Sequence, residues 1–424
     1  MAGKGLILSA PNSGSGKTVI TLGILRALKE RSVDVISAKS GPDYIDPRFH
    51  ALASQSECFN LDAWAMSEER IACIVSKKSK YLIIEGAMGL FDGALPDAQG
   101  STAHLGHILK LPIILIIDAS KTSQSIAAIA QGFINFDPRL KIGGIILNKV
   151  GSEKHERILR NSLNAVNIPV LGCVYRDPQL KLPSRHLGLV QAQELSDLNK
   201  FINNAAQIME SSIDLDHLIK ICTDLPAQST SEIIPPPAQR IAIASDAAFA
   251  FTYPHILDDW HKSGAEISTF SPLSDQVPDA CDLVFLPGGY PELYAAKLAN
   301  AHQFKKALKA SAKVYGECGG YMTMGNILID EEGYAHKMLG LLNLETSFEN
   351  KKLHLGYREI YAEDGLFTGF YSAHEFHYAT TISAKGQSLF SVRDSEQNKL
   401  PDSGLIDGKS SGSFLHIIDK SSKK

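Results

Sequence analysis

Residues 8–18 read Leu8-Ser9-Ala10-Pro11-Asn12-Ser13-Gly14-Ser15-Gly16-Lys17-Thr18, and this stretch decides the fold of the first half of the chain. The run before it, Gly5 to Leu8, is apolar and predicts a buried strand, and the apolar residues within 19–28 recur at helical spacing. A loop of small residues between a strand and a helix is the layout of a phosphate-binding loop. The backbone N–H groups of such a loop and the positive end of the helix face the phosphate oxygens. We therefore predict that this loop binds a nucleotide.

The residues of the loop have separate expected roles. Gly14, Ser15 and Gly16 are expected to bind ATP with their backbone N–H groups. Lys17 is expected to reach the β- and γ-phosphates, and the Thr18 hydroxyl to hold Mg²⁺. A solvated lysine in a glycine-rich turn is the alternative without a ligand, and the flanking strand and helix favour the nucleotide.

Composition limits the class of protein. A chain of 424 residues is long enough for two or three domains. Its net charge of −4 gives no electrostatic reason to expect nucleic acid or an anionic membrane as a partner. The six cysteines show no C-x-x-C pair, and the longest apolar run, 111–117, is too short to span a bilayer. We expect a soluble cytoplasmic protein with free thiols.

Strands and helices alternate through the first half. Apolar runs at 32–38, 81–84, 112–117, 144–147 and 169–172 predict strands, and 124–133 and 155–166 predict helices between them. This order predicts a doubly wound parallel sheet, whose ligands bind at the carboxyl ends of its strands. Polar residues stand at these ends, namely Lys39, Asp43, Asp46, Glu85, Asp92, Asp118, Asn148 and Lys149. The two aspartates after the first of these strands fit a ligand site and a plain turn equally well.

A proline-rich interval divides the chain. Small polar residues and three consecutive prolines, 235–237, follow the helical pattern of 191–221. We place a first domain at 1–225, a linker at 226–239 and a second domain at 240–424. Strands predicted at 240–244, 282–286 and 313–315 alternate with helices again, so the expected fold class is α/β with two doubly wound domains.

The second domain contains a candidate nucleophile. Cys318 lies between a short strand and a helical segment, within Gly316-Glu317-Cys318-Gly319-Gly320. Such a turn resembles the nucleophile elbow of α/β hydrolases, which holds the side chain strained and exposed, and the helix behind it would lower the thiol pKa. A buried structural cysteine is the alternative, and the flanking glycines argue against it.

Several long motifs together resemble the corrinoid a,c-diamide synthases, from the first strand almost to the C-terminus. The first domain is similar to dethiobiotin synthetase and the second to class I glutamine amidotransferases. The phosphate loop has Pro11 in place of the first glycine of G-x-x-x-x-G-K-[ST], a change that this family tolerates. The other motifs that carry the resemblance are residues 39–47, 60–64, 85–93, 100–105, 147–152, 182–190, 286–292 and 316–320.

The resemblance implies a carbon–nitrogen ligase of cobalamin biosynthesis that takes nitrogen from L-glutamine. The first domain would use ATP and Mg²⁺ to convert a corrinoid carboxylate to an acyl phosphate. The second would release ammonia from glutamine through a thioester on Cys318, and ammonia would displace phosphate at the a and c acetate side chains in turn. Hydrogenobyrinic acid is preferred over cobyrinic acid, because the motifs around Lys17 and Lys39 look closer to the aerobic-pathway enzymes.

The resemblance also implies site residues in the second domain. His416, in Ser413-Phe414-Leu415-His416, matches the catalytic histidine, and His374 and His377 compete for that role. Class I amidotransferases usually have an orienting glutamate two residues after the histidine, where this chain has Ile418. The backbone near Gly288, Gly289 and Gly319 is expected to form the oxyanion hole.

In the first domain, the expected metal-binding residues are Thr18, Asp43 and Glu85. Asp46 and Asp92 are expected to orient substrate or phosphate, although the sequence leaves open which acid has which role. Arg185 and His186 lie in a segment that the family has near the tetrapyrrole, so they are expected to contact substrate carboxylates.

Three alternatives remain. A nickel-sirohydrochlorin a,c-diamide synthase is a close relative, and cobyric acid synthase shares both activities but fits the chain length and loop motifs less well. A P-loop partitioning ATPase would not need Cys318 and commonly carries a basic or amphipathic tail, whereas residues 420–424 are basic without an apolar face. The oligomeric state is open, with a homodimer as one option.

Overall fold

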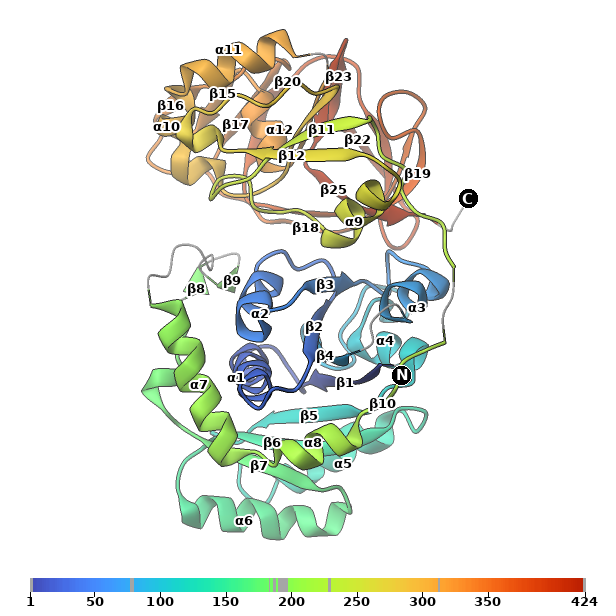
Figure 1. Ribbon diagram of the computed structural model, residues 1–424, viewed down its shortest axis with the longest axis vertical. Helices are drawn as coiled ribbons and strands as arrows, with labels where there is room; N and C mark the ends of the chain where they lie inside the picture. Colours follow the sequence, from blue (N-terminus) through green and yellow to red (C-terminus); the bar gives the residue numbers. More distant parts are fainter. Residues whose placement is uncertain are drawn as a thin grey trace. The chain divides into compact units, whose positions relative to one another are not determined.

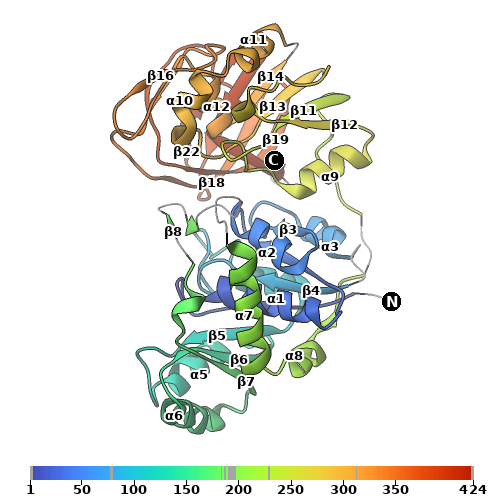
Figure 2. The same ribbon diagram turned by 60° about the vertical axis from the view of Figure 1, so that its left-hand side comes forward.

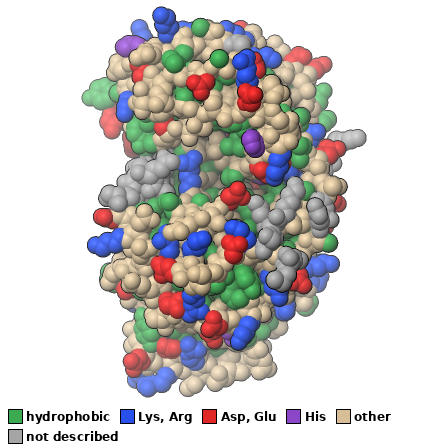
Figure 3. Space-filling view, in the orientation of Figure 1, with side chains coloured by type: hydrophobic (Ala, Val, Ile, Leu, Met, Phe, Trp, Pro, Cys, Tyr) green, Lys and Arg blue, Asp and Glu red, His purple; other side chains and the backbone are tan. Residues whose placement is uncertain are grey.

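The computed structural model describes residues 3–76, 80–182, 184–185, 188–189, 197–227, 230–311 and 313–421. The chain forms two compact units, Met1–Ser231 and Glu232–Lys424 (Figures 1 and 2). Within the described residues, no helix is both long and apolar enough to cross a membrane. Acidic and basic side chains are intermingled on the face shown in Figure 3.

The first unit is built on a parallel sheet, as predicted. Its strands run in the order β3-β2-β4-β1-β5-β6-β7, and β10 adds an antiparallel pair to β1. The central strands are apolar and buried on both faces, which is the pattern of a sheet covered by helices on each side. The bounds are β1 (Lys4–Ser9), β2 (Val35–Ser40), β3 (Cys58–Leu61), β4 (Tyr81–Glu85), β5 (Ile113–Asp118), β6 (Ile142–Val150), β7 (Val170–Tyr175) and β10 (Thr223–Asp224).

Helices follow most strands of this sheet (Figure 1). Helix α1 packs against α2 and α7. The bounds are α1 (Lys17–Glu30), α2 (Asp46–Ser54), α3 (Glu68–Ser76), α4 (Thr102–Leu109), α5 (Ile126–Phe136), α6 (Glu153–Leu163), α7 (Leu198–Ser212) and α8 (Leu215–Ile221). Short elements are η1 (Asn164–Val166), η2 (Pro178–Leu180), β8 (Ser184–Arg185) and β9 (Gly188–Leu189).

The second unit also has a central parallel sheet. Its order is β12-β11-β13-β14-β24-β23, in which only β23 is antiparallel to its neighbour. The strands are β11 (Arg240–Ala244), β12 (Glu266–Phe270), β13 (Leu283–Leu286), β14 (Val314–Glu317), β23 (Leu405–Asp407) and β24 (Ser410–Ser413). The helices are α9 (Pro254–Lys262), η4 (Pro272–Ser274), η5 (Pro291–Tyr294), α10 (Ala295–Ala299), α11 (His302–Ala310) and α12 (Gly319–Met324).

Two further sheets, which the sequence analysis did not predict, complete the second unit. One is mixed, in the order β16-β15-β17-β20, and the other is antiparallel, in the order β22-β21-β18-β19-β25. Strand β25 starts one residue beyond the end of β24, so the chain passes from the parallel sheet into the antiparallel one beside β14. The bounds are β15 (Ile327–Ile329), β16 (Ala335–Lys337), β17 (Leu344–Ser347), β18 (His354–Ala362), β19 (Gly369–His377), β20 (Thr380–Ala384), β21 (Phe390–Arg393), β22 (Lys399–Ser403) and β25 (Leu415–Lys420).

Candidate active sites

The predicted phosphate loop joins β1 to α1. Gly14 and Gly16 have φ values of 77° and 90°, which glycine adopts without strain. A Cβ on Gly16 would lie 2.2 Å from Nδ2 of Asn148, so a side chain there would displace this amide from the Ser15 carbonyl. Gly16 is also the N-cap of α1 and has no side chain with which to cap it. The N–H groups of the first turn, which have no partners within the helix, are therefore left for a ligand.

Residues from neighbouring strand ends hold this loop. The Asn148 side-chain amide donates to the Ser15 carbonyl at 2.8 Å. Lys149 donates to the Gly14 carbonyl at 2.9 Å and pairs with Asp118 at 2.6 Å. The loop conformation is thus set by the carboxyl ends of β5 and β6, where a parallel sheet places its ligands.

Lys17 is buried between two loops. Its Nζ donates to the Met88 carbonyl at 2.6 Å. Burial lowers the pKa of Lys17, and the nearby carboxylates of Glu85 and Asp46 oppose that shift. Asp92 is exposed, and its carboxylate accepts the Gly89 N–H at 2.8 Å, so it shapes the loop that supplies Met88.

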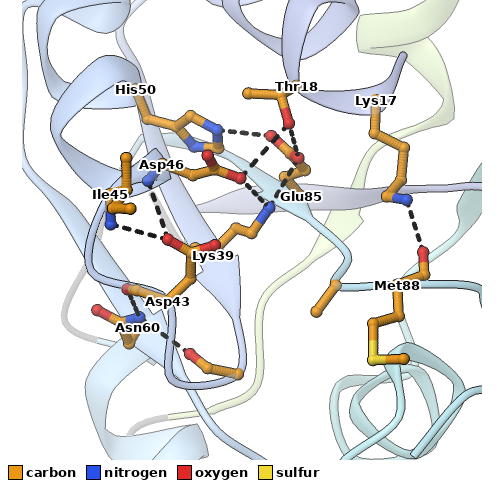
Figure 4. A network of polar contacts seen from close by, with 12 residues as sticks. Lys17, Thr18, Lys39, Asp43, Ile45, Asp46, His50, Asn60, Glu85 and Met88 are labelled. Carbon is orange, nitrogen blue, oxygen red and sulfur yellow. Dashed lines mark hydrogen bonds and ion pairs between the residues drawn. The ribbon is translucent and has the colours of Figure 1, made fainter. Parts of the chain in front are cut away.

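Figure 4 shows a network centred on the carboxylate of Glu85, at the end of β4. One oxygen, Oε1, accepts from the Thr18 hydroxyl at 2.7 Å and from Lys39 Nζ at 2.8 Å, and Oε2 lies 2.6 Å from Nε2 of His50. Asp46 Oδ2 accepts from Lys39 at 2.5 Å and from Thr18 at 3.4 Å. Residues from α1, α2, β2 and β4 therefore converge at one point.

The charges in this network balance one another. Burial would raise the pKa of Glu85, but Lys39 and His50 outweigh it and hold that pKa well below its usual range. Burial would also lower the pKa of Lys39, and Asp46 and Glu85 raise it instead. For Asp46, burial and the charge of Asp43 raise the pKa to about 6. The network therefore holds a charged Glu85 beside a charged Lys39.

The donor set of this network fits a magnesium ion. The Thr18 hydroxyl lies 2.7 Å from Glu85 Oε1 and 3.4 Å from Asp46 Oδ2, and Mg²⁺ prefers such oxygen ligands. The Lys39 ammonium contacts the same two carboxylate oxygens, so Mg²⁺ would bind there in its place. Asp43 has a different position, since its Oδ1 accepts the N–H groups of Ile45 and Asp46 at 2.8 and 3.0 Å at the start of α2. The geometry thus groups Asp46, rather than Asp43, with the other metal-binding candidates.

Two residues of this network, Lys39 and His50, were not predicted as site residues. Two residues that were predicted, Arg185 and His186, cannot be placed. Lys39 was noted at a strand end but given no role, and nothing in the sequence singled out His50, a lone histidine in α2. Arg185 belongs to β8, but its side chain lies outside the described residues, as does all of His186.

In the second unit, Cys318 lies in a tight turn between β14 and α12, as predicted. Its φ of 45° and ψ of −102° are strained for a residue with a side chain. The Cys318 N–H donates to the Ser413 carbonyl at 2.8 Å. A Cβ on Gly320 would lie 1.8 Å from the Leu286 carbonyl oxygen, so only glycine permits this approach of α12 to β13. The strain is thus held by packing on both sides of the turn.

Two expectations for Cys318 were wrong. The side chain is buried, with 3% of its surface exposed, rather than exposed at the turn. Burial raises the pKa of the Cys318 thiol, and the carboxylates of Glu292 and Glu317 add to that shift. The Gly319 N–H opposes it too weakly, because loss of solvation outweighs one backbone dipole. The thiol therefore needs a nearby base to become a nucleophile.

His416 lies next to Cys318. A Cβ on Gly288 would lie 2.3 Å from Cε1 and 3.0 Å from Nε2 of His416, and 3.4 Å from Cβ of Cys318. Both side chains therefore border the space over Gly288. The other predicted oxyanion residues are close by, since a Cβ on Gly319 would lie 3.0 Å from the backbone nitrogen of Gly289.

The two competing histidines have different surroundings. His374 lies opposite His416 in the pairing of β19 with β25, and burial together with the neighbouring His416 lowers its pKa to about 3. His377 stacks on Phe414 with ring centroids 4.0 Å apart, and its two ring nitrogens contact the Ala379 carbonyl and Glu375. His416 is thus the histidine whose ring borders the same space as Cys318.

Comparison with known proteins matches both halves of the chain. Residues 6–190 match the CobQ/CobB/MinD/ParA nucleotide binding domain, and residues 240–424 match the CobB/CobQ-like glutamine amidotransferase domain. The chain is 49% identical over 430 residues to a hydrogenobyrinate a,c-diamide synthase of Brucella anthropi, with 98% of both chains covered. It is 47% identical to the protein of that name from Sinorhizobium sp, again with 98% of both covered.

Proposed function

Because the chain belongs to the hydrogenobyrinate a,c-diamide synthase family, we propose that it converts two corrinoid carboxylates to amides with ATP and glutamine. The observation that carries this proposal is the presence of two matched sites in one chain. One has a phosphate loop with oxygen ligands for a metal, and the other has a buried cysteine beside a histidine. Amide formation from a free acid needs both activation and a nitrogen source.

The first unit activates the carboxylate. A carboxylate oxygen attacks the γ-phosphorus of ATP, the bond to ADP breaks, and an acyl phosphate forms, which replaces a poor leaving group with a good one. Lys17 stabilises the charge on the phosphate oxygens, and Lys39 stays paired with Asp46 and Glu85. Thr18, Asp46 and Glu85 would hold Mg²⁺, which neutralises phosphate charge when bound.

The second unit supplies ammonia. His416 accepts the thiol proton of Cys318 as the sulfur attacks the glutamine side-chain amide. The backbone near Gly288, Gly289 and Gly319 stabilises the oxyanion, and His416 returns the proton to the departing ammonia. Water then hydrolyses the thioester to glutamate. Ammonia attacks the acyl phosphate, so phosphate leaves and the amide remains.

The substrate can be identified directly. The pure protein is incubated with ATP, Mg²⁺ and glutamine and, in separate reactions, hydrogenobyrinic acid, cobyrinic acid or nickel-sirohydrochlorin. We expect mass spectrometry to detect a diamide of hydrogenobyrinic acid. A diamide of another tetrapyrrole would change the assigned substrate, and ATP hydrolysis without any amidation would instead favour a P-loop ATPase of another class.

The two sites can be separated by mutation. Cys318→Ala should abolish amidation from glutamine but retain it with added ammonium, because only the nitrogen source is lost. Lys17→Ala should lower both activities by about 10²- to 10³-fold, the usual effect of removing a preorganised charge at a reacting group.

The control is Cys281→Ala, which removes another free cysteine of the second unit. It should retain both activities. Glutamine-dependent amidation by Cys318→Ala would contradict the assignment of the nucleophile.

A further inference from the structure

We propose that Glu317, the residue directly before the nucleophile, is the positioning residue for the imidazole of His416. This inference rests on the proposed role of the second unit as a glutaminase. It accounts for the absence of a glutamate two residues after the histidine, where the chain has Ile418, whose side chain is completely buried.

The Glu317 carboxylate is fixed at one oxygen and directed at His416 with the other. Oε1 accepts the Ile417 N–H at 3.2 Å and the Tyr315 hydroxyl at 3.4 Å. Oε2 lies 3.5 Å from Nδ1 of His416. Both side chains are largely removed from solvent, with 8% of Glu317 and 1% of His416 exposed. The contact is therefore only weakly screened by water.

The sheet topology explains this contact. Strands β14 and β24 are parallel neighbours, with Glu317 opposite Ser413 at their ends. Strand β25 begins two residues after Ser413, which brings His416 back beside the end of β14. The same strand end therefore supplies both Cys318 and Glu317, one for each side of the imidazole.

The arrangement has a chemical purpose. The Glu317 carboxylate faces Nδ1 of His416, and the other ring nitrogen, Nε2, borders the space shared with Cys318. Nε2 is therefore the atom that exchanges the thiol proton with Cys318. It also stabilises the imidazolium that forms when His416 takes the thiol proton. This matters here because burial raises the pKa of the Cys318 thiol.

Two other ionisable groups near this site are engaged elsewhere or uncharged. Glu375 pairs with Arg358 at 2.7 Å and with His377 at 3.2 Å. His374, which faces His416 from β19, has a pKa lowered to about 3 by burial and by His416, so it is neutral. Among the described residues, the groups that bear on His416 thus include Glu317 from β14, Cys318 from the turn and neutral His374. Glu292 of η5 adds a further carboxylate on the side of Cys318.

Glu317→Gln tests the proposal, because glutamine retains an oxygen for the Ile417 N–H and loses the charge. In the full-length enzyme, we expect kcat for glutamine hydrolysis to fall by at least about 10-fold and by as much as about 10⁴-fold, which is the loss known for an amide in place of the carboxylate that orients a catalytic histidine. The KM for glutamine should change little. Glu317→Asp should recover part of kcat, which a merely structural role of the residue would not explain.

Two comparisons make the outcome decisive. Glu345→Gln, the same change on β17, should retain wild-type glutaminase activity, and ammonium-dependent amidation should be unchanged in both variants. An unaltered kcat in Glu317→Gln, with His416→Ala inactive, would overturn this proposal and leave the proposed function of the site intact. Full glutaminase activity in His416→Ala would instead overturn the proposed function of the site.

Discussion

His50 is completely buried and yet bears a charge in the network around Glu85. Burial alone would lower the pKa of His50, but contacts with Cys58 and Glu85 raise it to about 10. Because this value exceeds the usual 6.5, the charged histidine contributes its full stability below about pH 6.5. That contribution is lost as the pH rises toward 10.

This behaviour predicts the effect of His50→Gln. The variant should unfold about 3–5 kcal/mol more easily at pH 6, because one partner of a buried ion pair is removed. Between pH 7 and 10, the wild-type unfolding free energy should decline more steeply than that of the variant. Urea titrations at several pH values, followed by Trp64 fluorescence in the Trp260→Phe background, measure both quantities. As a control, His107→Gln removes a partly exposed pair with Asp137 and should lower the unfolding free energy by less than about 1 kcal/mol. Parallel pH dependences of the unfolding free energy in the wild type and His50→Gln would contradict a charged His50.

The sequence predicted individual residues where chemistry and position coincide. Thr18 and Glu85 could be named because one belongs to the phosphate loop and the other ends a buried strand. His50 could not, because its burial depends on how α2 packs in three dimensions. The pKa of Cys318 was predicted with the wrong sign for the same reason, since desolvation comes from neighbours that are distant in sequence.

At the scale of elements, a glycine governs the contact between α1 and α7. A Cβ on Gly23 would lie 2.4 Å from Cγ of Met209 and 2.8 Å from the Ala205 carbonyl oxygen. Gly23→Ala should therefore push the helices apart and destabilise the protein by about 1–3 kcal/mol. Gly132 in α5 has nothing within 4 Å of the corresponding position.

Gly132→Ala is thus the matched control, and it should stabilise the protein by up to about 1 kcal/mol through helix propensity alone. Thermal unfolding of the two variants compares them directly. A stabilising Gly23→Ala would show that the packing of α7 on α1 relaxes without cost.

The elements that the sequence predicted best are the parallel strands, because continuous apolar runs such as 113–117 mark strands covered on both faces. The antiparallel sheet was not predicted. Strand β18 is only half-buried along most of its length and carries Tyr357-Arg358-Glu359, so it shows no clear alternation of apolar and polar residues. Its pairing with β19 and β21 is decided by the rest of the fold.

At the scale of the molecule, each unit contains one of the two tryptophans, Trp64 in the first and Trp260 in the second. Both side chains are buried, so the fluorescence of each reports its own unit. We expect ATP with Mg²⁺ to raise the urea midpoint in Trp260→Phe, which retains Trp64. At 100 times its dissociation constant, a ligand stabilises its folded site by about 2.7 kcal/mol.

The urea midpoint in Trp64→Phe, which retains Trp260, should change little, and Lys17→Ala should abolish the shift seen through Trp64. Equal shifts through both tryptophans would mean that the two units unfold as one cooperative block.

Strand β10 returns the end of the first unit to its beginning. Lys4 lies opposite Asp224, and the Leu225 N–H donates to the Gly3 carbonyl at 2.9 Å. Both ends meet at the amino edge of the parallel strands, whereas the phosphate loop leaves the carboxyl edge. A short peptide could therefore join the two ends, with new termini opened in the exposed loop 137–141 between α5 and β6. Such a circular permutation would change the connectivity of the first unit and leave its nucleotide site intact.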